Sequence, residues 1–211
     1  MFYNNIIKQG GVSMQYEMKT ERTILMNNHN KELLSQINIA PYIQLGTNLI
    51  SKARKAGGNM FRHQMDTYSV LIDYGYIDSI LLKASVIHDC IEDIPDFDSN
   101  LIKNCDEEGE EVLNLVLEVS KKKGESKPDF LKRIINKGSQ RAKILKTADR
   151  ISNMTSLGYV TEPNFIEKTC NDTEFFLLPL AILVDYNMYQ ELIKLLESRR
   201  KYLELINYFT N

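Results

Sequence analysis

The sequence predicts a single, all-α domain. Apolar residues recur every three or four positions along most of the chain, and strand-like alternation never extends beyond a few positions. A length of 211 residues allows one sizeable core and is too short for two large domains. With 43% hydrophobic and 26% charged residues, the composition is that of an ordinary globular protein.

The beginning of the chain differs from the rest. Residues 1–30 are polar and are expected to form a weakly ordered extension, while residues 31–211 form the folded domain. Gln9-Gly10-Gly11 could be encoded by a ribosome-binding sequence. This leads to the hypothesis that Met14 is the true start of the protein.

The expected helices follow from periodicity, glycines, prolines and capping residues. Helical periodicity extends over 31–55, 63–74, 78–94, 107–122, a segment beginning near Pro128, 142–157, 165–184 and 188–208. Gly57-Gly58-Asn59 ends the first helix and Gly75 the second. Asp78 is a suitable N-cap for the third helix, which Pro95 ends. Pro179 should bend the helix in which it lies.

Composition and charge exclude several classes of function. A formal net charge of −2 provides no basic surface for holding nucleic acid. No apolar run approaches the roughly 20 residues of a membrane span. Cys90, Cys105 and Cys170 lack metal-finger spacing and are expected to be free thiols, as in a reducing compartment. A cytoplasmic protein is therefore expected, without a nucleic-acid or membrane partner.

The last helix has an apolar face with two interpretations. Its apolar residues are Leu192, Ile193, Leu195, Leu196, Leu203, Leu205 and Ile206. Such a face is typical of core packing. It would equally suit an interface between copies of the chain, so a homo-oligomer stays an open alternative.

The most informative stretch is a group of ionisable residues within an apolar helical run. His88 and Glu92 are four positions apart, and Asp89 and Asp93 repeat this spacing, so each pair shares a helix face. Burying these groups without compensation is costly. A bound cation would supply the compensation, and His beside Asp suits a metal site.

Further candidate ligands lie elsewhere in the chain, which has only three histidines. His63 follows the glycine break, and Asp149 comes late in another apolar helical stretch. With His88 and Asp89 they provide two imidazoles and two carboxylates. This donor set suits Mn²⁺, Fe²⁺ or Zn²⁺ and leaves coordination positions for water and substrate.

Each of these residues also has a purely structural interpretation. A lone His63 could be a surface or capping histidine. Asp149 could pair with Arg150 or Lys146. Glu92-Asp93 could be a solvated helix end. Only the combination, in the order His, His-Asp, Asp, indicates a metal centre more strongly than any one residue does.

That order resembles the HD-domain metal-dependent phosphohydrolases. His88-Asp89-Cys90-Ile91-Glu92-Asp93 is similar to the His-Asp-x-x-Glu-Asp motif of the alarmone hydrolases, namely the hydrolase part of RelA/SpoT-type proteins and the stand-alone small enzymes. Arg54-Lys55-Ala56-Gly57 resembles the family's Arg-Lys-x-Gly run. Lys146-Thr147-Ala148-Asp149-Arg150-Ile151-Ser152-Asn153-Met154 resembles its Lys-Leu-Ala-Asp-Arg-x-x-Asn-Met segment.

The match extends over roughly residues 49–183 and keeps every proposed ligand. A later block, Asp172-Thr173 and then Leu178-Pro179-Leu180-Ala181, resembles the family's Glu-Thr and Ala-Pro-Leu-Ala segments. The sequence departs from the family's residues at Met60, Gln64, Ile94, Thr147, Ser152 and Thr155.

The resemblance implies an HD-domain helical bundle that hydrolyses guanosine 3′-diphosphate 5′-(di/tri)phosphate, (p)ppGpp, to GDP or GTP and pyrophosphate. His63, His88, Asp89 and Asp149 would bind one divalent ion, most simply Mn²⁺. The expected catalytic residues are Glu92 and Asp93, which would orient water or accept its proton. The expected substrate-binding residues are Arg54, Lys55, Lys146 and Asn153.

Two alternatives remain. The first is another HD-type phosphohydrolase: a dinucleotide phosphatase, a deoxynucleotidase or a cyclic-nucleotide phosphodiesterase. The second is a non-catalytic nucleotide sensor. Each has a small nucleotide as its ligand.

Overall fold

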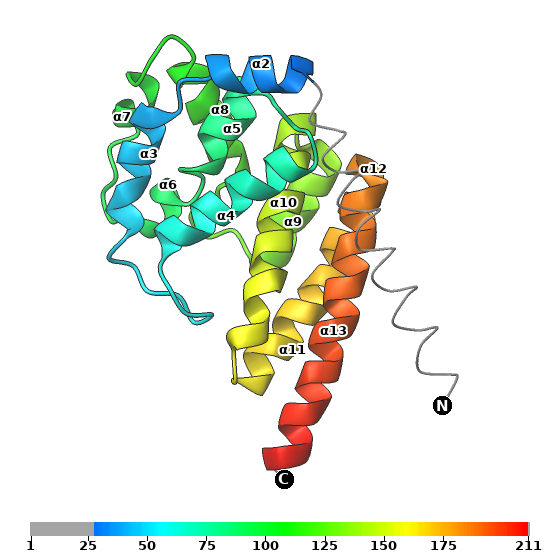
Figure 1. Cartoon of the computed structure of the whole chain (residues 1–211). Helices are drawn as coiled ribbons and strands as arrows, with labels where there is room; N and C mark the ends of the chain where they lie inside the picture. The colour runs from blue at the N-terminus through cyan, green and yellow to red at the C-terminus, as the bar shows by residue number, and fades with distance from the viewer. Residues whose placement is uncertain (1–27, 211) are drawn as a thin grey trace.

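In the computed structural model, which describes residues 28–210, all regular structure is helical and forms one domain (Figure 1). The elements are α2 (Asn28–Gln36), α3 (Ala40–Gly46), η1 (Thr47–Leu49), α4 (Met60–Asp73), α5 (Ser79–Ser85), α6 (Cys90–Asp93), α7 (Asn100–Lys103), α8 (Gly109–Val119), α9 (Lys127–Lys137), α10 (Gln140–Ser156), η2 (Leu157–Tyr159), α11 (Pro163–Asp172), η3 (Thr173–Leu177), α12 (Leu178–Val184) and α13 (Tyr186–Thr210). The predicted all-α fold is confirmed. The hypothesis about Met14 lies outside the described residues, as does most of the expected extension, although α2 already begins at Asn28.

Capping contacts begin two of the helices; the one at Asp78 was predicted, whereas α4 begins three residues before the expected His63. Asn59 accepts a hydrogen bond from the Arg62 N–H at 2.9 Å and begins α4. Asp78 accepts from the Leu81 N–H at 2.8 Å and begins α5. Before α4, Gly57 has a φ of +81°, which a residue with a side chain rarely adopts. The glycine turn therefore allows α4 to begin with a cap, whereas the preceding helical region has already ended at Leu49 and not at the glycines, as the sequence predicted.

Two predicted helices are wrong in their extent, and one short helix was not predicted. The helix expected over 31–55 is divided, because Pro41 lacks an N–H and lies in the first turn of the new helix α3, which begins at Ala40. The helix expected over 78–94 ends at Ser85 and resumes at Cys90. The acidic stretch after Pro95 contains the short helix α7, which its periodicity did not indicate.

The segment around Pro179 behaves largely as expected. α11 and α12 are joined by η3, a π-helical turn that directly precedes the α12 residues Leu178 and Pro179. Proline cannot donate to the preceding turn, so the regular α-helical hydrogen bonds are interrupted here. The interruption brings Thr173 beside α10, where its hydroxyl lies 3.4 Å from a nitrogen of Arg150.

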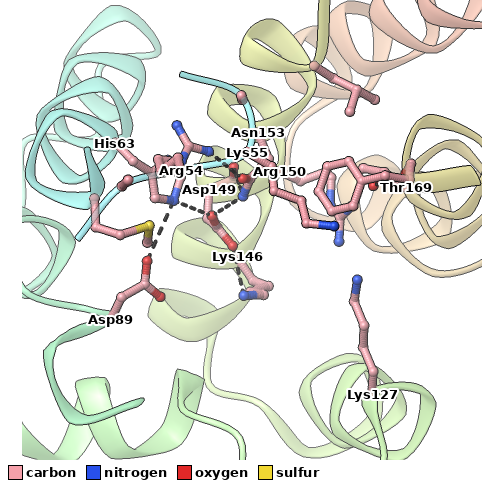
Figure 2. Close-up of a pocket in the computed structure, with 15 residues that line it drawn as sticks. Arg54, Lys55, His63, Asp89, Lys127, Lys146, Asp149, Arg150, Asn153 and Thr169 are labelled. Atoms are coloured by element: carbon pink, nitrogen blue, oxygen red, sulfur yellow. Dashed lines mark hydrogen bonds and ion pairs between the residues drawn. The ribbon is translucent and has the colours of Figure 1, made fainter. Parts of the chain in front are cut away.

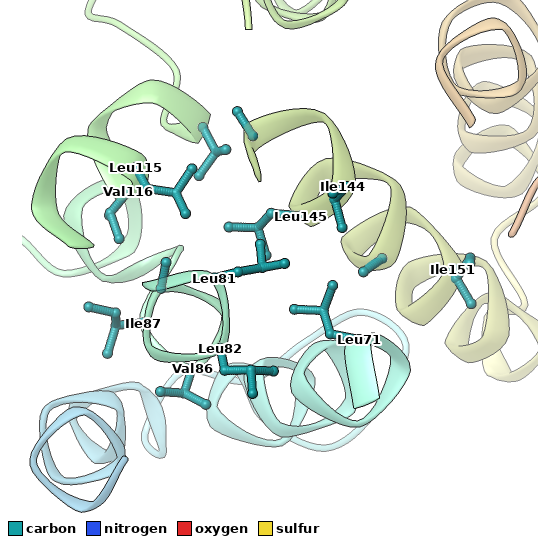
Figure 3. Packing of buried hydrophobic residues seen from close by; sticks show 14 of the residues in the cluster. Leu71, Leu81, Leu82, Val86, Ile87, Leu115, Val116, Ile144, Leu145 and Ile151 are labelled. Atoms are coloured by element: carbon teal, nitrogen blue, oxygen red, sulfur yellow. The ribbon is translucent and has the colours of Figure 1, made fainter. Parts of the chain in front are cut away.

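α10 is the central element of the bundle. It packs against α4, α5 and α8 on one side and against α12 and α13 on the other (Figure 1). Figure 3 shows Leu71, Leu81, Leu145 and Ile151 among the buried side chains that α4, α5 and α10 contribute to the core. Since α10 carries Asp149, the packing of both halves of the protein determines where this carboxylate lies.

α13 contributes to the core mainly through its first half. Met188, Leu192 and Leu196 are buried, whereas Leu205 is 56% exposed. The core interpretation of the last helix is therefore confirmed for its first half. Among the residues described here, no helix combines the length and the apolarity needed to cross a bilayer.

Candidate functional site

The first turn of α4 positions His63. Its side chain is buried, and its Nδ1 lies 2.9 Å from the Ser152 hydroxyl of α10. A hydrogen bond at one imidazole nitrogen fixes the ring, so that the other nitrogen has a defined direction. His63 Nε2 is thereby held close to Asp149, with 3.0 Å between this nitrogen and Asp149 Oδ1.

His88 and Asp89 lie in a turn between α5 and α6, and not on the continuous helix that the sequence predicted. The Ile87 N–H donates to the Ala84 carbonyl and the Cys90 N–H to the Ile87 carbonyl, as in successive tight turns. On an α-helix neighbouring side chains point about 100° apart. The turn removes this restriction and allows both side chains to face the same site.

The local contacts of His88 leave one of its nitrogens without a protein partner. His88 Nδ1 lies 2.7 Å from the Ser85 carbonyl, which as an acceptor selects the tautomer with a proton on Nδ1. His88 Nε2 is buried and has no hydrogen-bond partner. A buried nitrogen with a free lone pair beside two carboxylates is what a metal ligand requires, so this residue fits a divalent ion.

The two carboxylates complete the group. Asp89 Oδ2 lies 3.7 Å from His63 Nε2 and 3.4 Å from His88 Nε2, and Asp149 Oδ1 lies 3.8 Å from His88 Nε2. Ligands bound to one ion at about 2.0–2.2 Å are separated by about 3–4 Å. The ligand atoms of His63, His88 and Asp149 lie within 4.8 Å of one another. Three separate segments therefore bring the four predicted ligands to one place.

The protonation of this group reflects its high density of negative charge. Burial lowers the pKa of His88, but Asp89 and Asp149 outweigh burial and raise it to about 9. Burial also opposes ionisation of Asp89, yet the imidazoles hold its pKa below the ordinary value. The centre thus favours a positive charge, which a proton or a cation can provide.

Asp149 is also bound from its other sides. The Lys146 ammonium lies 2.7 Å from Oδ2, so the sequence-based alternative that Asp149 pairs with Lys146 applies together with the ligand geometry. Asn153 Nδ2 donates to Oδ1 at 2.5 Å. Asn153 Oδ1 in turn accepts from the Arg54 guanidinium at 2.8 Å. Figure 2 shows this chain of contacts from Lys146 to Arg54.

A cavity of about 380 Å³ opens beside these residues. All four predicted substrate-binding residues, Arg54, Lys55, Lys146 and Asn153, line it. Lys55 lies 4.9 Å above the ring of Phe165, which adds an aromatic face to the wall. The structure therefore brings the predicted substrate-binding residues together next to the predicted ligands.

The predicted catalytic pair is one turn away, and its side chains have other partners. Glu92 Oε1 accepts a hydrogen bond from the Lys121 N–H at 2.7 Å. Partial burial raises the pKa of Glu92 above its ordinary value, although the residue as a whole is exposed. Asp93 pairs with Lys52 at 2.5 Å. Neither carboxylate lines the cavity, so their catalytic role stays a prediction.

Two cations in the wall add to the predicted set. Lys127 lines the cavity and pairs with Asp172 at 2.6 Å. Arg150 also lines it and is only 5% exposed. Its Nε has no hydrogen-bond partner, and no ion pair within 4 Å joins it to a described carboxylate. The alternative that Asp149 pairs with Arg150 is therefore wrong. In Figure 2, Lys127 and Arg150 lie across the cavity from Asp89.

Sequence reasoning missed Lys127 entirely and gave Arg150 only the place of a weaker phosphate-binding candidate. Lys127 lies in a polar stretch of lysines, which looks solvated before α9 is folded against the bundle. Arg150 follows Asp149 directly, so pairing between them was the simpler interpretation. Only the buried position of Arg150 indicates that it requires an anion from elsewhere.

Comparison with known proteins gives one line of support, at the level of fold. No protein-family model matches the chain, and no curated protein matches it. Among solved structures, it is similar to one described as a metazoan ortholog of SpoT that hydrolyzes ppGpp and plays a role in starvation responses. The identity is 21%, the TM-score is 0.59, and the match covers 76% of this chain and 94% of that chain. The chain thus has the fold of that SpoT ortholog, which confirms the helical bundle expected from its HD-type motifs.

Proposed function

We propose that the protein is a metal-dependent phosphohydrolase acting on a nucleotide with phosphate groups at two positions, of which (p)ppGpp is the first candidate. The observation that carries this proposal is the convergence of two imidazoles and two carboxylates from α4, the turn at 86–89 and α10 beside a cationic cavity. The fold shared with a ppGpp-hydrolysing protein agrees with it. The His-Asp-x-x-Glu-Asp motif supports the same substrate.

His63, His88, Asp89 and Asp149 would hold one divalent ion. When bound, such an ion lowers the pKa of water and neutralises charge on a phosphoryl oxygen. Two imidazoles with two carboxylates form a borderline-to-hard donor set, which suits Mn²⁺. The hydrogen bonds at His63 Nδ1 and His88 Nδ1 would hold both rings in the orientation that binding needs.

The cations around the cavity fit a substrate with more than one anionic group. Arg54 and Lys146 lie close to Asp149, next to the metal ligands. Lys127 and Arg150 lie across the cavity (Figure 2). A phosphoryl group near the metal ligands would contact Arg54 and Lys146. A second phosphate across the cavity would contact Arg150. Arg150 is suited to this because its planar guanidinium binds phosphate oxygens in pairs.

The remaining walls offer contacts for the nucleoside. Phe165 presents a ring on which a base can stack. Asn153 bridges Asp149 and Arg54 and can exchange one of these hydrogen bonds for a ribose or base contact. Together these residues favour a nucleotide over a simple phosphate ester.

Glu92 and Asp93 would act on the attacking water. Water would form a new bond to the phosphorus next to the 3′ oxygen, and the bond from that phosphorus to the 3′ oxygen would break. The 3′ oxygen leaves as a hydroxyl and pyrophosphate is released, so a proton must move from water towards the leaving group. The raised pKa of Glu92 agrees with a role in this transfer. That role requires the side chain to leave the Lys121 N–H.

The experiment is incubation of the purified protein with ppGpp and Mn²⁺, with chromatographic detection of GDP and pyrophosphate. We expect stoichiometric release of both products, abolished by a chelator and by His88→Ala. His29→Ala is the matched control, because His29 lies on α2 and is exposed. Turnover that persists in His88→Ala would contradict the proposal.

A panel of other nucleotides distinguishes the alternatives. The panel contains a deoxynucleoside triphosphate, a dinucleotide carrying a 2′- or 3′-phosphate and a cyclic nucleotide. If one of these is hydrolysed faster than ppGpp, the proposed metal site stands and the proposed substrate is wrong. Nucleotide binding without any product would indicate a sensor.

The free thiols Cys90, Cys105 and Cys170 agree with the proposed cytoplasmic location.

A further inference from the structure

Gln64 is the residue next to His63 on α4, and its side chain has no exposed surface. Its Nε2 donates a hydrogen bond to Asp89 Oδ2 at 2.8 Å. This oxygen is the one that lies 3.7 Å from His63 Nε2 and 3.4 Å from His88 Nε2. Gln64 therefore contacts the proposed metal site without being one of its ligands.

The other end of the same amide is unsatisfied. Gln64 Oε1 is buried and has no hydrogen-bond partner. A buried carbonyl oxygen without a donor destabilises the folded state, whereas an apolar side chain of similar shape would avoid that loss. Stability of α4 therefore does not explain why this position holds an amide. The hydrogen bond from the amide to Asp89 does.

The hydrogen bond from Gln64 matters for Asp89 because little else fixes the orientation of its carboxylate. It lies in the turn between α5 and α6, and its side chain is 20% exposed. Among the residues that the structure describes, Gln64 is the side chain whose hydrogen bond fixes the Asp89 carboxylate. Both flanking imidazoles use their Nδ1 for other partners, Ser152 and Ser85.

We propose that Gln64 is a positioning residue that holds Asp89 ready to bind the divalent ion. The N–H donor fixes the rotation of the carboxylate so that Oδ2 faces both imidazoles before an ion arrives. The inference rests on the proposed metal site but is independent of which nucleotide the protein hydrolyses.

The test compares the metal-free stability and the Mn²⁺ affinity of Gln64→Leu with those of the wild type. We expect the thermal midpoint of the metal-free variant to stay close to that of the wild type, because removal of the unsatisfied oxygen offsets the loss of the hydrogen bond to Asp89. Titration calorimetry should give a Kd for Mn²⁺ that is about 10- to 100-fold weaker. A purely structural residue would not weaken Mn²⁺ binding while the stability of the metal-free protein stays the same.

Thr67→Val is the matched control. Thr67 is fully buried one turn further along α4, and its hydroxyl donates to the His63 carbonyl without contacting a proposed ligand side chain. We expect its Kd for Mn²⁺ to stay within about twofold of the wild type. Gln64→Met keeps the length of the side chain and replaces Gln64→Leu if the latter does not fold.

The outcomes separate this inference from the proposed function. If His88→Ala loses Mn²⁺ binding while Gln64→Leu and Gln64→Met keep the wild-type Kd, the positioning role is wrong and the metal site stands. If the control loses as much affinity as Gln64→Leu, the positioning role is also wrong. If His88→Ala binds Mn²⁺ as tightly as the wild type, the proposed metal site fails as well.

Discussion

Arg150 is the residue whose position is hardest to explain by stability alone. Its guanidinium is almost fully buried in the cavity wall, its Nε is unpartnered, and a single weak contact joins it to Thr173. Burial lowers the pKa of Arg150, but guanidinium remains charged at any ordinary pH. Asp149 and Asp172 act on this charge from a distance, but no described carboxylate pairs with it directly, and a buried charge without a direct partner is costly. An anionic ligand would supply that partner.

Replacing Arg150 by Met should therefore separate stability from substrate binding. We expect no loss of thermal stability and a rise in KM of about 10- to 100-fold, which corresponds to the loss of one charge-assisted contact. Steady-state kinetics with ppGpp measures the KM. Arg62→Met is the control, because Arg62 is exposed outside the cavity. An unchanged KM in Arg150→Met would remove this residue from the binding site.

At the scale of elements, the turn at 86–89 depends on its neighbour α3. Gly46 of α3 lies so close that a Cβ there would be 2.6 Å from the Val86 carbonyl oxygen. Because backbone cannot move away as easily as a side chain, any larger residue must displace the turn. Gly46 thus allows α3 to support the segment that carries His88 and Asp89.

Gly46→Ala should weaken both folding and metal binding. We expect a loss of about 1–3 kcal/mol in the free energy of unfolding and a weaker Kd for Mn²⁺. Gly109→Ala is the control, because its Cβ would also approach a backbone oxygen, that of Lys103 at 2.4 Å, but at the start of α8. It should lose stability and keep the Mn²⁺ affinity. If Gly46→Ala and Gly109→Ala change the Kd for Mn²⁺ equally, the claim that α3 supports the turn is wrong.

Arg133 of α9 forms hydrogen bonds with the C-terminal end of α8. It donates to the Glu118 and Ser120 carbonyls, which lack helical partners, and to both oxygens of Glu125. These hydrogen bonds lower the pKa of Glu125 from 4.5 to about 2. The contribution of the ionised carboxylate to stability is therefore complete above about pH 4.5 and is lost as the pH falls towards 2.

Arg133→Met should cost about 1–3 kcal/mol in the free energy of unfolding at pH 7. The difference from the wild type should shrink between pH 4.5 and 3, because protonation of Glu125 in the unfolded wild type removes part of its advantage. Urea unfolding at several pH values measures this difference, with Lys132→Met as the exposed control on the same helix. A difference independent of pH would show that Glu125 plays no part.

These elements also show where sequence reasoning succeeded and where it failed. The cap at Asp78 was predicted because capping is a local property of the chain, whereas the cap at Asn59 was taken only as part of the glycine break. The end of α5 at Ser85 was not predicted, because most residues from Ile80 to Ile87 are apolar and the turn that follows is stabilised by α3 and by the histidine contacts. Local patterns cannot report a break that tertiary packing produces.

On the scale of the whole molecule, α10 connects the site to both halves of the bundle. It packs against α4, which carries His63, and against α13, which closes the other side. The ligands could be found from the sequence because histidine is rare in this chain, with three residues in all. Lys127 was missed and Arg150 was only a weaker candidate, because both belong to 26 lysines and arginines that composition does not distinguish. Only the assembled fold separates the few that line the cavity.

The central claim is that one divalent ion binds where α4, α10 and the turn at 86–89 meet. Anomalous diffraction from crystals grown with Mn²⁺ tests this most directly. We predict one strong peak about 2.0–2.2 Å from His63 Nε2, His88 Nε2 and a carboxylate oxygen of both Asp89 and Asp149. No peak among these four residues at saturating Mn²⁺, or a peak only elsewhere on the protein, would contradict the claim.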